Sequence, residues 1–396
     1  MYALTETFKR FFDSEKTSGI ILIGCMVLSL SLANSTLGPA WLAIWHADIA
    51  GLSLGHWIND GLMAIFFLLI GLELERELYV GELSNFRNAL LPVVAAIGGM
   101  AAPALIHFVF NTGLPTQAGI GIPMATDIAF ALGALALLGT RVPPALKVFV
   151  VAFAVIDDLG AIILIALFYS GDLSIAYLVG GLAVWGVLLL LNRYGRVYSL
   201  PIYLIGGVVM WVLMLKSGVH ATIAGVMLAF AIPFWSPDDG RPSPSHRLEN
   251  LLHKPVAFLI LPLFALANTG VVLDGSLLSA MLDPNSLGIV GGLVIGKPVG
   301  ILLCALLTLW LGWCVLPEDL NWRHVLGAGM LGGIGFTMSI FITNLAFANQ
   351  PEMIDISKLA VFTGSLIAGV LGSVWLAWVG RQTDLESALP NESASA

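Results

Sequence analysis

Two adjacent carboxylates, Asp157 and Asp158, lie in the middle of an apolar segment that runs from Ala145 to Tyr169. The only other charge in this segment is Lys147, close to one end. Asp157 is therefore about twelve residues, or ~18 Å of helix, from either end, which exceeds the ~15 Å half-thickness of a bilayer's hydrocarbon. If the segment spans a membrane, both acids lie near its midplane.

A pair of acids at this depth can hold either a proton or a small hard cation. Close carboxylates in a low dielectric resist joint ionisation, so their titrations are coupled. Oxygen ligands select Na⁺ or Li⁺ over softer metals. Neighbouring helical residues point about 100° apart, so one carboxylate can line an aqueous path while the other meets a partner such as Lys297. A site of this kind that opens alternately to each side performs exchange.

Two further ionisable residues, Asp127 and Lys297, fall within apolar segments. Each of the four buried charges costs on the order of 3 kcal/mol to insert into a bilayer, which favours a functional or pairing role. Lys297 could instead extend to the membrane surface. Its side chain reaches roughly 6 Å, however, and the nearer end of its span is ~16 Å away. We therefore expect Lys297 to pair with an acid.

Helix-breaking residues interrupt two of the apolar segments, at Gly121, Pro123, Gly133, Gly329, Gly332, Gly333 and Gly335. Irregular backbone at this depth is tolerated only where it is buried in protein or lines a cavity. The glycines could instead serve only close packing. The Thr126–Asp127 and Thr337–Met338 breaks, however, fall in the fourth and eleventh spans, the middle members of two triplets. Such matched breaks indicate an inverted-repeat transporter with its site at the midplane. Asp127 is suited to offset the positive ends of the half-helices and Lys297 the negative ends.

The composition is that of a polytopic membrane protein. Of the 396 residues, 58% are hydrophobic and 11% charged, against ~25% charged in an average soluble domain, and the mean hydropathy is +0.94. Runs long enough to span occur at roughly 19–34, 58–80, 90–110, 121–139, 144–170, 175–192, 200–215, 218–235, 255–273, 286–311, 325–348 and 359–380. We therefore expect an all-α fold of about twelve transmembrane helices in a single transmembrane domain over residues 1–396. The first run could instead be a cleaved signal peptide, but so many later spans favour a retained helix.

Lys and Arg residues are distributed unevenly between the two sides of the predicted membrane. If both termini are cytoplasmic, 14 of the 17 lie inside, only Lys216 and Lys358 lie outside, and Lys297 lies within a span. This distribution obeys the positive-inside rule and supports an even number of helices. Two loops are distinctive. The Pro-rich segment Ser236–Arg247 is predicted to be a solvated cytoplasmic connector, and the outside segment Trp41–Trp57 could form a short hairpin on the membrane surface.

The chain resembles the bacterial NhaA-type sodium/proton antiporters, a family built from inverted repeats. The resemblance runs over nearly the whole chain. The segments that carry it are, in order, WINDGLMAIFFLLIGLELERELYVGEL, ATDIAFALGALALLG, AVIDDLGAI, LKSGVHATIAGV, RLENLLHKPVAFLILPLFALAN, IGKPVGI and GIGFTMSIFI.

This resemblance implies a bacterial inner-membrane protein with two inverted three-helix repeats, at 90–170 and 286–380. The remaining helices would form an interface domain through which the protein makes a homodimer. Sodium or lithium ions would leave the cell as external protons enter. More protons than sodium ions would move per cycle, so that transport is electrogenic.

The resemblance also implies roles for individual residues. Asp158 resembles the main cation ligand, with Thr126 and Asp127 in the unwound segment beside the ion. Asp157, Asp158 and Lys297 resemble the groups that carry protons. The partners are the transported Na⁺ or Li⁺, protons and the lipid bilayer, and neither a cofactor nor a nucleic acid is implied.

The family is activated as the cytoplasm turns alkaline. The residues that match its pH-response positions are Glu73, Arg76, Glu77, His220, Glu249 and His253. Charges at helix ends can also be ordinary interfacial groups, and a lone histidine beside a helix start can be structural, so both interpretations stay open. Asn250 stands where family members can carry a histidine, which leaves the pH range of activation open.

Two other function classes fit a membrane protein with buried acids. An intramembrane aspartyl protease would use paired aspartates to activate water, but the Tyr-Asp and Gly-x-Gly-Asp motifs of those enzymes are absent from the sequence. A sodium-coupled symporter on the same scaffold would need more polar side chains around a larger cavity. We therefore expect a Na⁺/H⁺ antiporter rather than an enzyme.

Overall fold

The computed structural model describes residues 6–171, 173–236, 242–317 and 319–388 and shows an all-α membrane protein with one short pair of strands. In these ranges, eight helices are long and apolar enough to cross a membrane, and one bent helix pair makes a ninth candidate span. The helices of eight or more residues are α1 (Glu6–Ala33), α2 (Gly38–Trp45), α4 (Met63–Tyr79), α5 (Phe86–Asn111), α6 (Ile128–Leu138), α7 (Pro144–Phe168), α8 (Ile175–Arg193), α9 (Leu200–Ser217), α11 (Pro244–Pro255), α12 (Leu261–Asn268), α14 (Pro284–Gly291), α15 (Lys297–Trp310), α16 (Trp322–Gly332), α17 (Phe336–Ala346) and α18 (Pro351–Ala388).

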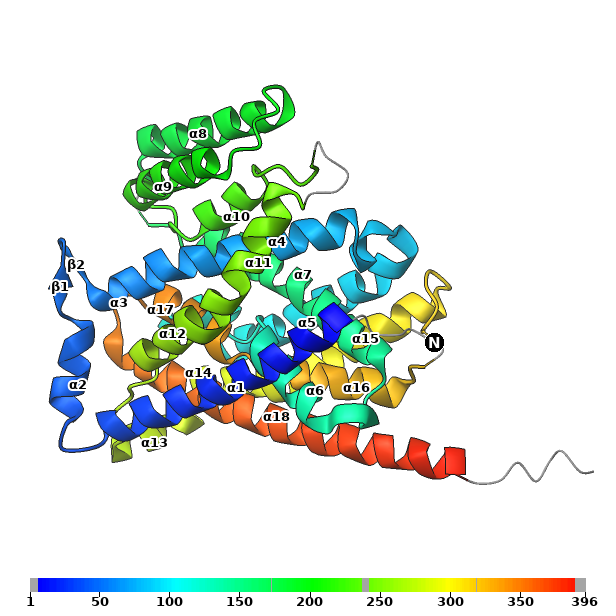
Figure 1. The fold of residues 1–396 in the computed structure, drawn as a ribbon. Helices are drawn as coiled ribbons and strands as arrows, with labels where there is room; N and C mark the ends of the chain where they lie inside the picture. Colours follow the sequence, from blue (N-terminus) through cyan, green and yellow to red (C-terminus); the bar gives the residue numbers. More distant parts are fainter. Residues whose placement is uncertain (1–5, 172, 237–241, 318, 389–396) are drawn as a thin grey trace, which may run out of the picture.

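Shorter elements connect or extend these helices (Figure 1). They are α3 (Leu54–His56), α10 (Ile223–Ala229), α13 (Gly275–Ser279), the strands β1 (Asp48–Ile49) and β2 (Leu52–Ser53), the 3₁₀ helices η2 (Glu82–Ser84), η3 (Pro115–Gly121), η4 (Gly139–Arg141) and η6 (Ala280–Leu282), and the π-helical turns η1 (Trp57–Leu62), η5 (Val256–Ile260) and η7 (Gly292–Gly296). The π turns continue directly into α4, α12 and α15, so each joins two helical pieces into one longer rod.

The predicted apolar runs correspond to helices that differ from them in extent. The first run, 19–34, is longer in the structure, because α1 begins at Glu6. The run at 121–139 is α-helical only over α6, and the run at 218–235 only over α10. The run at 255–273 begins earlier, at Pro244, because the amphipathic α11 leads into it. The last run is also longer than predicted, because α18 begins at Pro351, where proline is suited to the first turn of a helix.

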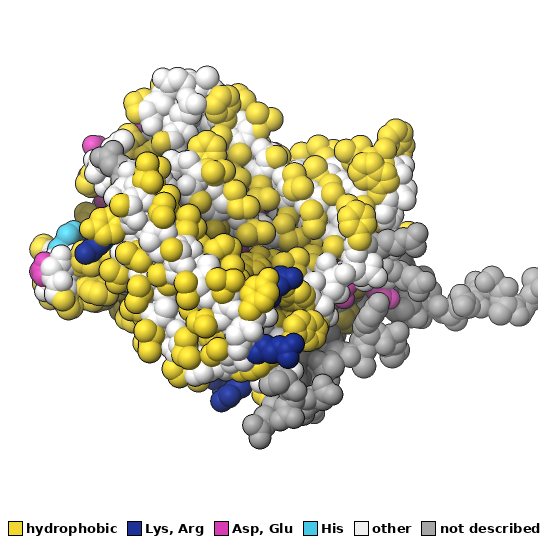
Figure 2. All heavy atoms as spheres, turned by 90° about the horizontal axis from the view of Figure 1, so that it is seen from above, with side chains coloured by type: hydrophobic (Ala, Val, Ile, Leu, Met, Phe, Trp, Pro, Cys, Tyr) yellow, Lys and Arg dark blue, Asp and Glu magenta, His cyan; other side chains and the backbone are white. Residues whose placement is uncertain are grey.

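The two ends of the bundle differ in character. The start of α1 and the end of α18 lie at one end of the molecule, and the β1–β2 hairpin lies at the opposite end (Figure 1). Apolar side chains cover most of the face seen in Figure 2, with few charges between them, as expected for a surface that faces lipid.

The predicted hairpin within Trp41–Trp57 is present. Strands β1 and β2 pair antiparallel through the Asp48–Ser53 and Ile49–Leu52 pairs. Both turn residues have positive φ, 56° at Ala50 and 85° at Gly51, as the favoured two-residue hairpin turn requires. The predicted connector Ser236–Arg247 is described only in part, since residues 237–241 lie outside the described ranges. Its Ser243 caps α11 by accepting a hydrogen bond from His246 N at 3.2 Å.

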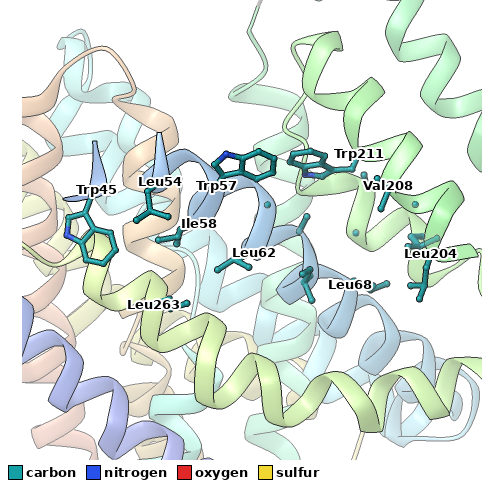
Figure 3. A pocket seen from close by; sticks show the side chains of 17 residues that line it. Trp45, Leu54, Trp57, Ile58, Leu62, Leu68, Leu204, Val208, Trp211 and Leu263 are labelled. Carbon is teal, nitrogen blue, oxygen red and sulfur yellow. The ribbon is translucent and has the colours of Figure 1, made fainter. Parts of the chain in front are cut away.

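An apolar cleft of about 630 Å³ lies beside α4, between this helix, α9, α10 and α12. Figure 3 shows Trp57 and Trp211 at its rim, where their rings stack with centroids 5.9 Å apart. Small residues deepen the cleft, among them Gly61 and Gly207. None of the described residues that line the cleft is charged, so it is suited to hydrocarbon rather than to ions.

Glycines allow α5 and α15 to cross at close range. A Cβ at Gly300 would overlap the carbonyl oxygen of Gly98, and a Cβ at Gly98 would overlap that of Gly300. Close approach at small residues is the usual way in which helices pack in lipid. This crossing fixes the start of α15, where Lys297 lies one turn from Gly300.

We predict that Gly300→Ala destabilises the protein by roughly 1–3 kcal/mol, because the added methyl must push the two helices apart. Thermal unfolding in detergent measures this as a lower Tm. Gly24→Ala on α1 is the matched control, since a Cβ there would meet no atom within 4 Å. An equal loss of stability in both variants would contradict the role of this crossing.

Candidate functional site

Two unwound segments cross near the centre of the bundle. One lies between η3 and α6, and the other, at Gly333–Gly335, separates α16 from α17, which are bent by 45°. The backbone N–H of Asp127 donates to Ile334 O at 2.6 Å. Ser339 Oγ donates to Ile122 O at 2.6 Å. Each broken helix thus satisfies part of the exposed backbone of the other, which makes irregular structure tolerable at membrane depth.

Both breaks are narrower than predicted. Gly133 lies inside the continuous helix α6, and Gly329 and Gly332 lie inside α16, so the prediction that these three interrupt a helix is wrong. A Cβ at Gly329 would crowd the backbone of Pro298 on α15, which shows that this glycine serves close packing. The Thr337–Met338 position is likewise helical, in the first turn of α17, and the break precedes it.

The carboxylate of Asp127 lies at the N-termini of both half-helices. Its Oδ1 accepts a hydrogen bond from Phe130 N at 3.1 Å and caps α6. Its Oδ2 accepts from Thr337 N at 3.0 Å and from Thr337 Oγ1 at 2.5 Å, at the start of α17. A carboxylate is stabilised at such positive helix ends. The expectation that Asp127 offsets them is confirmed.

The predicted pairing of Lys297 with an acid is also confirmed. Lys297 Nζ forms an ion pair with Asp157 Oδ2, and it donates to Thr126 Oγ1 at 2.7 Å. The Lys297 side chain is fully buried and that of Asp157 is 1% exposed. The π turn η7 directly precedes Lys297, and such turns re-aim the residues that follow, often at functional sites.

Thr126 connects this pair to the second broken helix. Its hydroxyl lies 2.6 Å from Asp157 Oδ2 and 2.8 Å from Gly332 O, the last residue of α16. One hydroxyl proton can serve only one of these acceptors at a time. Lys297 therefore reaches the negative end of α16 through Thr126, rather than directly as the sequence suggested.

Asp158 is a buried acid with an oxygen that has no hydrogen-bond partner among the described residues. The side chain is 1% exposed, and the oxygen is its Oδ1. The same holds for Oδ1 of Asp157, one residue earlier on α7. A buried carboxylate oxygen without a donor is costly unless a proton or a cation occupies it. The two oxygens are thus suited to bind one or the other.

The described residues contain no group of three or more His, Cys, Asp and Glu side chains arranged to hold a metal ion. A cation at the aspartates would therefore complete its shell with hydroxyl, carbonyl or water oxygens. Such a shell suits Na⁺ or Li⁺, which are hard ions.

The residues matched to a pH response form one group and one outlier. Arg76 links α4 to α11, because its Nη1 lies 3.3 Å from Glu249 Oε1. Its Nη2 lies 3.3 Å from Oε1 of Glu77, the next residue on α4. Glu73 lies one turn before Arg76 on α4, and His253 one turn after Glu249 on α11.

His220 lies apart from this group, between α9 and α10. Its Nδ1 is 3.7 Å from Asp60 Oδ1, and His56 Nε2 lies 2.9 Å from the other carboxylate oxygen of Asp60. Asp60 lies in η1, near the hairpin end of the second predicted span, whereas Arg76 is near the opposite end of the same rod.

Sequence reasoning missed two polar contacts in the bundle. The buried Glu75 accepts a hydrogen bond from Ser245 Oγ at 3.1 Å, beside the Arg76–Glu249 pair. Three amides, those of Asn59, Asn268 and Asn344, meet between η1, α12 and α17. The sequence feature that could have indicated this second contact is a polar amide within each of three apolar segments.

Comparison with known proteins gives consistent matches over most of the chain. The Na⁺/H⁺ antiporter 1 family model matches residues 9–376. The Na⁺/H⁺ antiporter NhaA of Dechloromonas aromatica (strain RCB) is 66% identical over 375 residues, which cover 95% of this chain and 96% of that protein. The NhaA 1 antiporter of Flavobacterium johnsoniae is 56% identical, over 95% of this chain and 98% of that protein. The NhaA 2 antiporter of Pseudomonas syringae pv. syringae is 50% identical, over 93% and 94% respectively.

We predict that Lys297→Met destabilises the protein by roughly 3–5 kcal/mol at pH 8, because it leaves the Asp157 carboxylate buried and unpaired. Asp157→Asn should be destabilising for the converse reason. The double variant should recover much of this loss, since it removes both charges. Thermal unfolding of the four proteins gives the coupling free energy. Additive losses in the double variant would contradict the buried ion pair.

Proposed function

This chain belongs to the Na⁺/H⁺ antiporter 1 family, and on that premise we propose that it is a secondary active transporter that exchanges intracellular Na⁺ or Li⁺ for external H⁺. It is a transporter and not an enzyme. The observation that carries the proposal is the Lys297–Asp157 pair next to the unpartnered oxygen of Asp158, where two broken helices cross.

In the proposed cycle, the cation and the protons compete for the same oxygens. Na⁺ binds to Asp158, with oxygens near Thr126 completing its shell and Asp127 holding the half-helix ends in place. Binding draws Asp157 away from Lys297 and favours the loss of protons from Lys297 and Asp158. Return of protons restores the pair and expels the cation. More than one proton is displaced by a single cation, so net charge crosses the membrane and the transport is electrogenic.

We propose twelve transmembrane segments in two units, one formed by two inverted repeats and the other an interface domain. The first repeat, residues 90–170, contains α5, the broken helix of η3 and α6, and α7. The second, residues 286–380, contains α14–α15, the broken helix of α16 and α17, and α18. The hydrogen bonds between the two breaks support this pairing of the middle members. The remaining helices form the interface domain.

Both termini are proposed to be cytoplasmic, in the inner membrane of a bacterium. The unequal distribution of Lys and Arg supports this orientation, as does the position of the start of α1 and the end of α18 at one end of the molecule. The hairpin then lies outside. Because it projects beyond the bundle (Figure 1) and its residues Asp48 and Ile49 are exposed, we propose it as a contact of a homodimer.

Activation at alkaline pH is proposed to act through the charges between α4 and α11. The Arg76–Glu249 pair joins these helices at the cytoplasmic end, Glu77 contacts Arg76 from within α4, and Glu73 and His253 lie one turn away. A change in protonation there would alter how tightly the two helices are held together. His220 would respond at the other end, through Asp60.

The exchange is tested with purified protein in vesicles that have an acidic interior and a pH-sensitive dye. Adding Na⁺ or Li⁺ should collapse the pH gradient, whereas K⁺ should not, because the larger ion fits the aspartate site poorly. An imposed membrane potential should change the rate, since net charge moves. A gradient unaffected by Na⁺ at pH 8 and above would count against the antiporter.

Asp158→Asn should abolish Na⁺-dependent proton flux while the protein remains folded, because the amide has the same shape but neither titrates nor carries charge. The same vesicle assay and a Tm measurement check both parts. Asp48→Asn on the exposed hairpin is the control, since its amide oxygen can still accept the hydrogen bond from Gly51 N. Sodium-dependent flux retained in Asp158→Asn would remove Asp158 from the site.

A further inference from the structure

Three amide side chains form a hydrogen-bonded cluster at the hairpin end of the bundle. Asn268 Nδ2 donates to Asn59 Oδ1 at 2.8 Å, and Asn59 Nδ2 donates to Asn268 Oδ1 at 3.4 Å. Asn344 Nδ2 donates to the same Asn268 Oδ1 at 2.7 Å. Asn268 is 4% exposed, and its Nδ2 also donates to Phe264 O at 2.9 Å. The central amide thus uses both donors and both lone pairs of its oxygen.

The hydrogen bonds of this cluster differ in whether they lie within one structural unit or connect two. Asn59 on η1 and Asn268 on α12 both belong to the interface domain of the proposed function, on which this inference rests. Asn344 belongs to α17, in the second repeat. The Asn344–Asn268 hydrogen bond therefore crosses between the two units, whereas the Asn59–Asn268 pair lies within one of them.

Helix α17 carries the ion site and this cluster on one face. Thr337, Phe341 and Asn344 follow the spacing i, i+4, i+7, so they lie above one another along the helix. Thr337 contacts Asp127 at the site. Seven residues of helix place Asn344 about 10 Å further along the axis, toward the proposed outer side.

Phe341, which lies between Thr337 and Asn344 on α17, packs against aromatic rings of two neighbouring helices. The ring of the fully buried Phe341 lies 5.4 Å from that of Phe67 on α4 and 6.4 Å from that of Phe264 on α12, measured between centroids. Along α17, from the site toward the proposed outer side, the aromatic contacts of Phe341 come first and the amide cluster follows.

We propose that the Asn344–Asn268 hydrogen bond is a latch that holds the outer side of the transporter closed. Alternating access requires the unit that carries the site to move against the interface domain. Opening to the outside separates α17 from α12, so this hydrogen bond must break in each cycle. Asn344 is a positioning residue, because it acts on the site through α17 and contacts no ion.

An amide suits this task better than a charge or an apolar group. In an apolar interior its hydrogen bond has one defined partner and geometry, so the closed state is a single position. Interhelical hydrogen bonds in membrane proteins are nevertheless weak enough to be broken repeatedly. When Asn344 moves away, the Asn59–Asn268 pair remains hydrogen-bonded, so Asn268 keeps a polar partner in the open state.

The latch is tested by the accessibility of a thiol introduced beneath it. Ala265→Cys places this thiol one turn inward from Asn268 on α12, at a position that is 1% exposed. The substitution is made in a background in which Cys25, Cys304 and Cys314 are replaced by alanine. A membrane-impermeant maleimide is added from the outside of cells, and the labelling rate is measured.

Asn344→Leu keeps a similar side-chain volume and removes only the Asn344–Asn268 hydrogen bond between the two units. It should speed outside labelling of the introduced thiol by about threefold, and by at most about twentyfold, the range that such hydrogen bonds give. Asn59→Leu is the matched control and should leave the rate unchanged, because the crossing hydrogen bond remains. An unchanged rate in Asn344→Leu, or an equal increase in Asn59→Leu, would overturn the latch.

A second measurement guards against misfolding of the leucine variant. Asn268→Cys and Asn344→Cys are combined, and the two thiols are joined by a short, thiol-cleavable bifunctional reagent. Crosslinking should stop Na⁺-dependent proton flux, and the reductant should restore it, whereas continued flux in the crosslinked protein would exclude the latch. The labelling experiment requires no transport, so it separates failure of the latch from failure of the antiporter, which the vesicle assay reports on the unmodified protein.

Discussion

The crossing of two broken helices is the constraint on which the rest of the structure depends. Four exposed helix ends at membrane depth would be prohibitively costly in lipid, and the protein satisfies them internally. The Asp127 N–H to Ile334 O hydrogen bond ties the two breaks together, and the Asp127 carboxylate caps the N-termini of both α6 and α17. Thr126, the next residue, connects the end of α16 to the Asp157–Lys297 pair. One short unwound segment thereby carries or contacts three of the four charges at the site, those of Asp127, Asp157 and Lys297.

Charge at membrane depth was the most informative feature of the sequence. The cost of burying Lys297 made an acidic partner necessary, and the partner found is Asp157. The need to compensate helix ends likewise predicted the position of Asp127. Glycine was less informative, because it serves both breaks and close packing. Gly333 and Gly335 mark a break, whereas Gly329 allows α16 to approach Pro298, and only the tertiary contacts distinguish the two uses.

Neutral polar groups were harder to interpret than charges. An asparagine in an apolar segment costs much less than a lysine, so a single one does not demand a partner. Asn59, Asn268 and Asn344 are separated by 209 and 76 residues along the chain, and nothing local to any of them indicates the other two. The ends of some helices could not be predicted for a similar reason. Residues 230–235 are mostly apolar, like the helix α10 before them, and hydropathy does not distinguish a buried turn from a helix.

The site and the proposed latch are coupled because α17 is one rigid helix with a function at each end. Its N-terminus faces Asp127, so the balance of charge around the aspartates acts on it directly. Its seventh residue beyond Thr337 holds the contact with α12. Packed interfaces change between discrete arrangements rather than continuously. An acid pair with neither cation nor proton would carry an uncompensated charge through a low dielectric when the unit moves, at a cost of several kcal/mol. On the proposed function, movement is therefore favourable only when the site is occupied, and the proposed latch makes the exchange obligatory because it lies on the same helix as the site.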